Sequence, residues 1–338
     1  MKQLGFYTGL RYFFTLLFPA LLFIGVLTII YEWDLSFVFS IAMPVLVVIN
    51  IIQLVFFMLK RKSLILFNIA SLILFFFFFD SFFQFNFNIT KRTQENSISL
   101  LSYNVHGFKP SHGNQNYSDE NVVDFIRENN PDIVCFQEFS AIKFKLFVDE
   151  YPYWVKTNLM IPNQKSVLAI FSKYPIVDKG YVEFANSLNN TMFVDVEISK
   201  KVIRVYNVHL ESYRTTLQHN INSVRSFMPL LKIVSQADKT RISQAKIVKK
   251  HIADYNGDVV ILGDFNCTQY TPAYLILKDL RKDTFVEAGN GFGSTYELFN
   301  YPFKIDHILV DETFEVVSHK NFNINLSDHE PVLAEIKL

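Results

Sequence analysis

The first 89 residues of this 338-residue chain are dominated by Phe, Leu and Ile and carry almost no charged side chains. Three long apolar runs follow one another there, at about 12–30, 35–59 and 63–83. A helix of roughly 20 apolar residues crosses the ~30 Å hydrocarbon core of a bilayer. Buried helices of a soluble protein are the alternative, but they rarely lack charge over three successive segments. We therefore expect residues 1–89 to form a membrane anchor of three transmembrane helices.

The positions of Lys and Arg predict the orientation of this anchor. A cleaved signal peptide is the alternative for the first run, but the run is long, lacks a small-residue cleavage site and is followed at once by a second span. Lys2 and Arg11 precede the first run, and three basic residues at 60–62 separate the second from the third. Positively charged loops stay in the cytoplasm, and these outweigh the basic pair at 91–92. The pattern predicts an integral membrane protein of the bacterial inner-membrane type, with the rest of the chain outside the cytoplasm.

Residues 97–338 follow a polar linker at 90–96 and have the mixed composition of a globular domain. Apolar and β-branched content predicts strands at 97–105, 131–138, 167–176, 191–198, 201–210, 258–266, 304–310, 314–320 and 330–336. Helical periodicity predicts helices at 117–129, 228–234, 241–255 and 271–280. Many strands with a few interspersed helices indicate a layered α/β sandwich. Cys135 and Cys267 lie inside or just after apolar strand patterns, so we expect buried free thiols.

Polar side chains of a few chemical types stand at the tips of nearly all these predicted strands. They are Asn104, Gln137, Glu138, Asn207, His209, Asp264, Asn266, Asp306, His307, Asp328 and His329. Tips that meet at one edge of a sheet form a rigidly held site. Carboxylates and carboxamides are oxygen ligands suited to Mg²⁺ or Mn²⁺, and a histidine beside an aspartate suits acid–base catalysis. The pattern therefore predicts a site that combines a divalent metal ion with proton transfer.

Six short motifs give the chain a resemblance to a known superfamily. They are SYNVHG (102–107), PDIVCFQE (131–138), VYNVHL (205–210), GDFN (263–266), KIDHILV (304–310) and SDHEPV (327–332). In this order they resemble the endonuclease/exonuclease/phosphatase superfamily, which includes deoxyribonuclease-I-like nucleases, abasic-site endonucleases, inositol-polyphosphate phosphatases and neutral sphingomyelinases. The resemblance covers residues 97–338. It implies a four-layered α/β/β/α sandwich and a Mg²⁺- or Mn²⁺-dependent enzyme that hydrolyses phosphate esters.

The resemblance also implies roles for individual residues. It makes Glu138 the principal metal ligand, with Asn104 beside it and Asp328 closing that side of the site. It makes His329 the general base that takes a proton from the attacking water. In-line attack on phosphorus needs a positioned water, a cation on the non-bridging oxygens and donors where charge grows. His329 would activate the positioned water, and the metal ligands would hold the cation.

The remaining catalytic roles fall on two further motifs. The resemblance implies that Asp264 and Asn266 orient the nucleophile and hold the phosphoryl oxygens. It implies that His209 stabilises developing phosphate charge or assists the leaving group. Asp306 is expected to be the carboxylate partner of His209, contributed by another strand.

Several of these residues also have structural interpretations. We expect Asn207, Asn266 and Thr295 to contact substrate, but Asn207 and Asn104 are equally typical of turns that satisfy local backbone groups. Glu138 follows an apolar strand, where burial without a partner is costly, and this favours a ligand role. The histidines that match no motif are expected to be structural, as is His307: His106, His112, His219, His251 and His319.

The substrate is expected to depend on loops rather than on the shared core. Residues 211–250 are rich in Lys and Arg and either grip a polyanion or an anionic lipid surface, or form the solvated face of a helix. A net charge of zero, from 32 basic and 32 acidic residues, provides no overall basic footprint for nucleic acid. An anchored domain lies near lipid headgroups, which favours a phospholipid or sphingolipid phosphodiesterase. The alternatives are a nuclease acting on DNA or RNA and a catalytically inactive, membrane-anchored binding module.

Overall fold

The computed structural model describes residues 2–60, 65–86, 97–110, 117–157, 166–185, 187–213, 227–298 and 300–338. The expected linker at 90–96 and residues 214–226 of the basic segment lie outside the described residues. The chain divides into two compact units. The first comprises Met1–Phe82 with Gln269–Pro272, and the second comprises Phe83–Thr268 with Ala273–Leu338. Each unit is described by itself.

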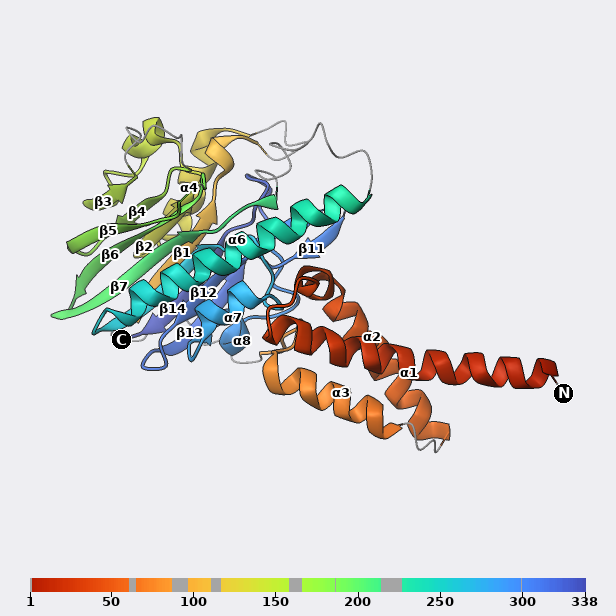
Figure 1. Cartoon of the computed structure of the whole chain (residues 1–338). Coiled ribbons are helices and arrows are strands. Elements are labelled where there is room, and N and C mark those ends of the chain that lie inside the picture. Colours follow the sequence, from red (N-terminus) through yellow and green to blue (C-terminus); the bar gives the residue numbers. More distant parts are fainter. Residues whose placement is uncertain are drawn as a thin grey trace. The chain divides into compact units, whose positions relative to one another are not determined.

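The first unit contains three apolar helices, and within its described residues one segment qualifies as a candidate membrane span. They are α1 (Lys2–Ile30), α2 (Ser36–Lys60) and α3 (Ile65–Phe78) (Figure 1). Within the described side chains, the 24 residues Ser36–Leu59 alone are long and apolar enough to cross a bilayer, whereas Thr15–Ile30 and Ile65–Phe78 are shorter apolar segments. Fourteen helical residues rise about 21 Å, less than a ~30 Å hydrocarbon core. The prediction of three transmembrane helices is therefore corrected to one candidate span.

Polar side chains join these helices to one another. Nδ2 of Asn68 on α3 donates to Oδ1 of Asn50 on α2 at 3.1 Å. Nδ2 of Asn50 donates to the carbonyl of Phe18 on α1 at 3.2 Å. Hydrogen bonds between apolar helices hold a bundle together without a charged residue, so these two asparagines have a packing role.

The second unit is built on two six-stranded mixed sheets and one short hairpin (Figure 1). Sheet I has the order β13-β14-β1-β2-β4-β3, and sheet II has the order β5-β6-β7-β8-β12-β9. The strands of sheet I are β1 (Ser97–Asn104), β2 (Ile133–Gln137), β3 (Tyr153–Lys156), β4 (Ala169–Ser172), β13 (Glu315–Asn321) and β14 (Val332–Lys337). Those of sheet II are β5 (Ile176–Glu183), β6 (Asn190–Ile198), β7 (Lys201–His209), β8 (Asp258–Asp264), β9 (Lys282–Asp283) and β12 (Asp306–Val310). The hairpin is β10 (Tyr296–Leu298) and β11 (Tyr301–Phe303).

The two sheets pack face to face and helices cover their outer faces. The helical elements are α4 (Asp119–Asn129), α6 (Phe227–Ala253), α7 (Pro272–Lys278), α8 (Thr284–Ala288) and the 3₁₀ turns η1 (His106–Phe108) and η2 (Ala141–Leu146). Met192 and Val194 of β6 lie in the core between the sheets, whereas Phe193 of the same strand packs against α6. The other outer face, on sheet I, packs against α4 through residues such as Val123. This arrangement is the predicted α/β/β/α sandwich (Figure 1).

Strand direction explains why distant motifs meet at one edge. β1 runs parallel to β2 and β7 runs parallel to β8, so the carboxyl ends of each pair coincide. β12 is antiparallel to β8, which places Asp306 at its start opposite Asp264 at the end of β8. β14 is antiparallel to β1, which brings the residues before Val332 toward the end of β1. Asp306-His307 thus begins β12 and Asp328-His329 precedes β14, so neither pair ends its strand, and antiparallel pairing brings both to the shared edge.

The basic segment at 211–250 differs from the prediction in its helices and in the burial of one arginine. The two helices expected at 228–234 and 241–255 form the single helix α6, because no glycine or proline interrupts the residues between them. Arg241, counted among the basic residues of a solvated face, is fully buried instead. Its Nη1 donates to the carbonyl of Glu211 at 3.0 Å, and its guanidinium lies over the ring of Tyr213 at 3.9 Å. Arg241 therefore stabilises the fold next to β7 and is not free to bind an anion.

Candidate active site

Asp264 stands at the centre of the polar edge. The backbone register places it directly between His209 on β7 and Asp306 on β12. Its Oδ2 accepts a hydrogen bond from Nδ2 of Asn104 at 2.9 Å and lies 3.6 Å from Nε2 of His209. The same oxygen lies 3.7 Å from Nε2 of His329. One buried carboxylate oxygen thus faces a carboxamide and two imidazoles from three different strands or loops.

A glycine before Asp264 allows this placement. Gly263 has φ +144, and a Cβ built there lies 2.0 Å from the carbonyl oxygen of Val208 on β7. A side chain at this position would force β8 away from β7. The first letter of the GDFN motif is therefore required by the close approach of the two strands that carry Asp264 and His209.

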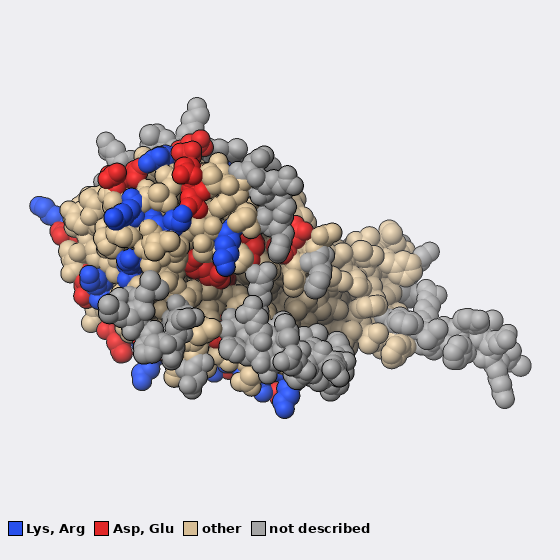
Figure 2. Space-filling view, turned by 90° about the horizontal axis from the view of Figure 1, so that it is seen from above, with Lys and Arg blue, Asp and Glu red and all other residues tan. Residues whose placement is uncertain are grey.

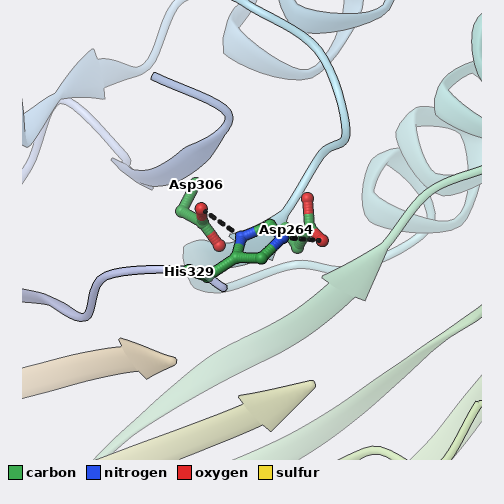
Figure 3. A group of neighbouring side chains, drawn as sticks. All are labelled: Asp264, Asp306 and His329. Carbon is green, nitrogen blue, oxygen red and sulfur yellow. Dashed lines mark hydrogen bonds and ion pairs between the residues drawn. The ribbon is translucent and has the colours of Figure 1, made fainter. Parts of the chain in front are cut away.

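Asp306 is the partner of His329. Its Oδ2 lies 2.9 Å from Nδ1 of His329, and both side chains are buried. Figure 3 shows Asp306 and Asp264 on opposite sides of the His329 ring, one at each ring nitrogen. Asp306 was expected to pair with His209. This expectation is wrong, because its carboxylate contacts Nδ1 of His329 instead. A carboxylate at Nδ1 places the proton there and leaves Nε2 facing Asp264.

His209 has a different environment. Its Nδ1 lies 3.1 Å from the hydroxyl of Ser166, and its ring is buried. Its Nε2 is 3.6 Å from Asp264 and 3.9 Å from Oε1 of Glu138, which is too long for a hydrogen bond. Among the residues that the structure describes, this buried nitrogen has no hydrogen-bond partner. The carboxylates of Asp264 and Glu138 near Nε2 favour the tautomer with the proton on that nitrogen, so His209 presents an unsatisfied donor to the site.

Glu138 and Asn104 lie together at the ends of neighbouring parallel strands. Nδ2 of Asn104 is 3.4 Å from Oε1 of Glu138, and Oδ1 of Asn104 accepts from the backbone N–H of His106 at 3.0 Å. The Glu138 side chain is 38% exposed, so the argument from costly burial does not apply to it. Its backbone has φ +48, a left-handed conformation that is uncommon for a residue with a side chain. Strained backbone of this kind concentrates at functional sites.

Asp328 closes the side of the site next to β1. Its neighbour Ser327 donates from Oγ to the backbone carbonyl of Asn104 at 2.8 Å, which attaches the SDHEPV loop to the end of β1. Oδ1 of Asp328 lies 3.5 Å from Nδ1 of His106. His106 was assigned a structural role by sequence, but it borders the site. The only signal was its position two residues after Asn104.

Two further predicted residues, Asn266 and Thr295, make hydrogen bonds to the backbone. The backbone N–H of Asn266 donates to Asp264 at 2.8 Å, and Nδ2 of Asn266 donates to the carbonyl of Leu210 at 3.0 Å. Thr295 is buried, and its hydroxyl accepts from the backbone N–H groups of Ile305 and Asp306, both at 3.1 Å. Thr295 therefore positions the start of β12, and its hydroxyl is occupied in that role.

Asn207 bridges the two sheets. Its Nδ2 donates to the carbonyls of Phe136 at 2.9 Å and Ala169 at 3.1 Å, and its Oδ1 accepts from Gln137 at 2.8 Å. The side chain is fully buried. Both polar ends are thus satisfied by sheet I, which places Asn207 among the residues that fix the sheets to each other.

His307 is buried away from the site. Its Nδ1 lies 2.7 Å from Nζ of Lys304, and its Nε2 lies 3.0 Å from the carbonyl of Cys267. Lys304 in turn pairs with Asp283 at 2.8 Å. Burial alone would raise the pKa of Asp283, but Lys304 and His307 outweigh it and hold that pKa well below its usual range. The predicted structural role of His307 is consistent with these contacts.

The charges at the centre of the site are coupled. Burial is the largest influence on Asp264 and raises its pKa; Asp306 adds to the effect and the two imidazoles oppose it. Burial alone would lower the pKa of His329, but Asp306 and Asp264 outweigh it and raise that pKa to about 10. Two carboxylates thus share one imidazolium. A proton delivered between Asp264 and His329 belongs to the pair rather than to either residue.

Two sets of residues offer ligand atoms for a divalent metal ion. Asp264, Asp306 and His329 present ligand atoms within 4.8 Å of one another. The 2.9 Å hydrogen bond between Asp306 and His329 already occupies one atom of each. Glu138 and Asp328 are the partly exposed carboxylates of the site, at 38% and 16% of their side chains. Hard oxygen donors that remain open to water suit Mg²⁺, which keeps several of its waters.

The charged surface of the second unit is mixed in sign. On the face shown in Figure 2, coloured Lys and Arg side chains are interspersed with Asp and Glu. Among the described residues, several exposed basic side chains are paired, such as Lys249 with Asp279 at 3.0 Å and Arg127 with Glu150 at 2.6 Å. A mixed surface lacks the single-sign field that attracts a long polyanion.

Comparisons with known proteins agree with this geometry. Residues 101–329 match the Endonuclease/Exonuclease/phosphatase family, and no curated protein matches the sequence. Among solved structures, the fold is similar to an endonuclease/exonuclease/phosphatase from Bacteroides vulgatus, with TM-score 0.55, 19% identity and coverage of 72% of this chain and 100% of that one. It is similar to truncated Caenorhabditis elegans TDP2, with TM-score 0.53, 17% identity and coverage of 72% and 98%.

A third similar structure is the Bacteroides thetaiotaomicron mannosyl-6-phosphatase Bt3783, with TM-score 0.51, 16% identity and coverage of 71% of this chain and 100% of that one. At these identities the likeness concerns the fold. The family match spans more than half of the chain and includes every residue of the site from Asn104 to His329. The chain therefore belongs to the endonuclease/exonuclease/phosphatase family.

Proposed function

We propose that the chain is a divalent-metal-dependent phosphoesterase that hydrolyses a phosphodiester or phosphomonoester by in-line attack of water. One observation carries the proposal: Oδ2 of Asp264 lies within 2.9–3.7 Å of Asn104, His209 and His329. A single carboxylate between two imidazoles, at the edge of a rigid sandwich, positions groups for both the nucleophile and the phosphoryl oxygens. Its supports are the family match and the polar edge described above.

The Asp264–His329 pair is the proton acceptor for the attacking water in this proposal. A water that contacts Oδ2 of Asp264 and Nε2 of His329, which are 3.7 Å apart, transfers its proton into the pair. Asp306 holds the His329 ring by its Nδ1 at 2.9 Å. Because its pKa is raised to about 10, His329 is an imidazolium at neutral pH, so Asp264 is the member of the pair that accepts the proton, in place of His329, the base predicted from sequence.

The phosphoryl group is bound on the other side of Asp264. His209 offers Nε2–H to a phosphoryl or leaving-group oxygen. Glu138, Asn104 and Asp328 are the proposed ligands of Mg²⁺ or Mn²⁺. When bound, such an ion supplies positive charge to the non-bridging oxygens as negative charge develops there. The backbone N–H of Asn266 holds the carboxylate of Asp264 in place. The proposal gives Asn207 and Thr295 no contact with substrate, because their polar atoms make hydrogen bonds within the protein.

The first unit is proposed to tether this domain to a membrane through α2. Ser36–Leu59 is 24 residues long and sufficiently apolar to span a bilayer. The expected location outside the cytoplasm required three crossings. With α2 as the single span, the basic residues 60–62 that directly follow it favour a catalytic domain on the cytoplasmic side. A protease added to intact cells is then expected to leave the region after residue 90 intact, and digestion there would reverse the orientation.

The tether and the mixed surface charge favour lipid headgroups or small phosphate esters as substrates. A neighbour in fold is described as a mannosyl-6-phosphatase, so small phosphomonoesters belong among the candidates. The matched family includes nucleases, so a nuclease is the second candidate. On the face shown in Figure 2, basic side chains are interspersed with acidic ones, and this favours a smaller substrate over a long polyanion. The inactive binding module is disfavoured by the presence of Glu138, His209, Asp264 and His329 together.

The experiment that tests the function is a substrate panel on the purified full chain. Phosphatidylinositol phosphates, sphingomyelin, sugar phosphates, RNA and DNA are incubated with Mg²⁺ or Mn²⁺ and with chelator. Metal-dependent hydrolysis of a lipid headgroup or a small ester that is lost in His209→Ala supports the proposal. Hydrolysis confined to nucleic acid would establish the nuclease. Binding without turnover of any class would establish the inactive module.

A further inference from the structure

An asparagine outside all the sequence motifs stands in line with the catalytic residues. Asn190, at the start of β6, is the backbone partner of His209 on β7. His209 is paired with Asp264, and Asp264 is paired with Asp306. Directly paired residues of adjacent strands project from the same face of a sheet, with Cβ atoms about 5 Å apart. Asn190 therefore extends the row of site residues across a fourth strand.

The strand alternation confirms which face Asn190 occupies. Met192 and Val194 of β6 lie in the core between the sheets. Because side chains alternate with period two, Asn190 lies on that same inner face at the strand end that carries the site. Thr191 lies on the opposite face with Phe193, which packs against α6.

The Asn190 side chain is buried and has no partner. Its exposed fraction is 0%, and neither Nδ2 nor Oδ1 makes a hydrogen bond to any residue that the structure describes. A buried polar group that is left unpaired carries its full desolvation penalty. The neighbouring Nε2 of His209 is unpaired as well. Two side chains at paired positions of adjacent strands, on the same face of the sheet, thus both carry unsatisfied polar atoms.

The backbone around Asn190 is held firmly, so this arrangement does not come from a loose loop. Nδ2 of Asn189 donates to the carbonyl of Leu210 at 2.8 Å, immediately after His209. The hydroxyl of Ser187 donates to Oε2 of Glu211 at 2.6 Å. Ser187 and Asn189, just before β6, are thereby attached to Glu211 and Leu210, just after β7, and Asn190 keeps a fixed position beside His209.

We propose that Asn190 is a substrate-binding residue whose carboxamide donates to an oxygen of the phosphoryl group held by His209. The inference rests on the proposed hydrolytic function and adds a residue to it. Nδ2 of Asn190 and Nε2 of His209 form a pair of donors on the side of Asp264 away from His329. Donors placed where negative charge grows stabilise the transition state more than the ground state.

The test uses full-length protein and two nearly isosteric substitutions on adjacent residues. Asn190→Leu removes the carboxamide from the site. Thr191→Val is the matched control, because Thr191 is also fully buried with an unpaired hydroxyl, but on the outer face of the sheet. Removing an unpaired buried polar atom relieves its desolvation cost. Both variants are therefore expected to raise Tm by about 2–4 °C.

Only Asn190→Leu is expected to impair function. It should lower kcat/KM for bis(p-nitrophenyl) phosphate or p-nitrophenyl phosphate by about 10²-fold and abolish most of the Tm increase that inorganic phosphate produces in the wild type. Asn190→Ser, which retains a smaller donor, should give an intermediate loss. Thr191→Val should retain wild-type kcat/KM and the full phosphate response.

Two results would overturn the inference. A lower Tm in Asn190→Leu would mean that the carboxamide has a structural partner. An unchanged kcat/KM and phosphate response in that variant would mean that Asn190 does not contact the phosphoryl group. The wild-type protein separates this outcome from a failure of the proposed function: if it neither hydrolyses either ester nor responds to phosphate, the hydrolytic function fails and this inference fails with it.

Discussion

Oδ2 of Asp306 lies 2.9 Å from Nδ1 of His329, although the two residues belong to different motifs 23 positions apart. Each of them also has a sequence neighbour of the complementary type, His307 and Asp328, with which it does not pair. His307 faces Lys304 and Cys267, and Asp328 faces His106. The functional carboxylate–imidazole pair is therefore assembled across the two Asp-His motifs.

Replacing Asp306 tests this pairing. Asp306→Asn is expected to lower kcat by about 10²–10⁴-fold, because the carboxamide no longer fixes the proton on Nδ1 of His329 or supports its positive charge. KM should change little, since Asp306 lies behind the imidazole. Steady-state kinetics measure both parameters. Asp283→Asn is not a suitable control, because Asp283 is buried against Lys304; Asp279→Asn, at an exposed ion pair with Lys249, is expected to retain full activity.

The shared role of Asp264 and His329 predicts non-additive kinetics. Asp264→Asn and His329→Gln should each reduce kcat by about 10³-fold, and the double variant should be little worse than the poorer single one. When two residues act as one unit, either substitution alone already removes their joint contribution to kcat. When they act independently, the losses from the two substitutions multiply. A double variant whose loss equals the product of the two single losses would show that proton transfer does not depend on the pair.

The proposed metal ligand predicts a change in metal dependence. Glu138→Gln should raise the Mg²⁺ concentration needed for half-maximal activity by at least about tenfold, because a neutral amide is a weaker ligand than a carboxylate. A magnesium titration of initial rates measures the shift. Glu150→Gln serves as control, since Glu150 pairs with Arg127 at 2.6 Å instead of facing the site. Equal metal dependence in both variants would remove Glu138 from the ligand set.

His319 predicts how stability depends on pH. Burial, with the nearby Lys304 and His307, lowers the pKa of His319 to about 3, although Asp283 opposes the shift. Below about pH 6.5 the unfolded chain binds a proton at this residue that the folded chain does not bind. The free energy of unfolding should therefore fall as pH decreases from about 6.5 toward 3, by up to about 1.4 kcal/mol per pH unit.

His319→Gln should reduce that slope. Pulse proteolysis of the full chain between pH 4.5 and 7.5 measures the free energy of unfolding at each pH. His251→Gln is the matched control: its pKa is also lowered by burial, but the residue is only partly buried, so the slope should change less. An identical slope in wild type and His319→Gln would mean that His319 is protonated in the folded chain.

The location of the site was predictable from sequence because strand geometry is local. Apolar and β-branched runs marked β1, β7 and β8, and their polar ends had to lie at an edge, since the core between the sheets accepts few unpaired polar groups. Asn104, His209 and Asp264 do meet there. The single glycine of the GDFN motif is explained by the backbone of Val208, whose carbonyl oxygen would lie 2.0 Å from a Cβ at that position.

The partners within the site were not predictable, because they depend on register between strands. Asp306 meets Asp264 and His329 only because β12 is antiparallel to β8 at that register, a relationship that no local pattern records. Asn190 shows the same limit. It lies outside every motif, and only its pairing with His209 places it in the row. Asn207 resembled a site residue by its position in the sequence, yet its side chain donates hydrogen bonds to two backbone carbonyls of the opposite sheet.

The central claim is metal-dependent phosphoester hydrolysis at Asp264, and one measurement tests it most directly. Purified full-length wild type and Asp264→Asn are assayed with bis(p-nitrophenyl) phosphate and p-nitrophenyl phosphate in the presence of Mg²⁺, Mn²⁺ or chelator. The account predicts turnover by the wild type with metal, none with chelator, and a loss of at least about 10³-fold in a folded Asp264→Asn protein. Equal turnover by the two proteins, or turnover that persists with chelator, would contradict it.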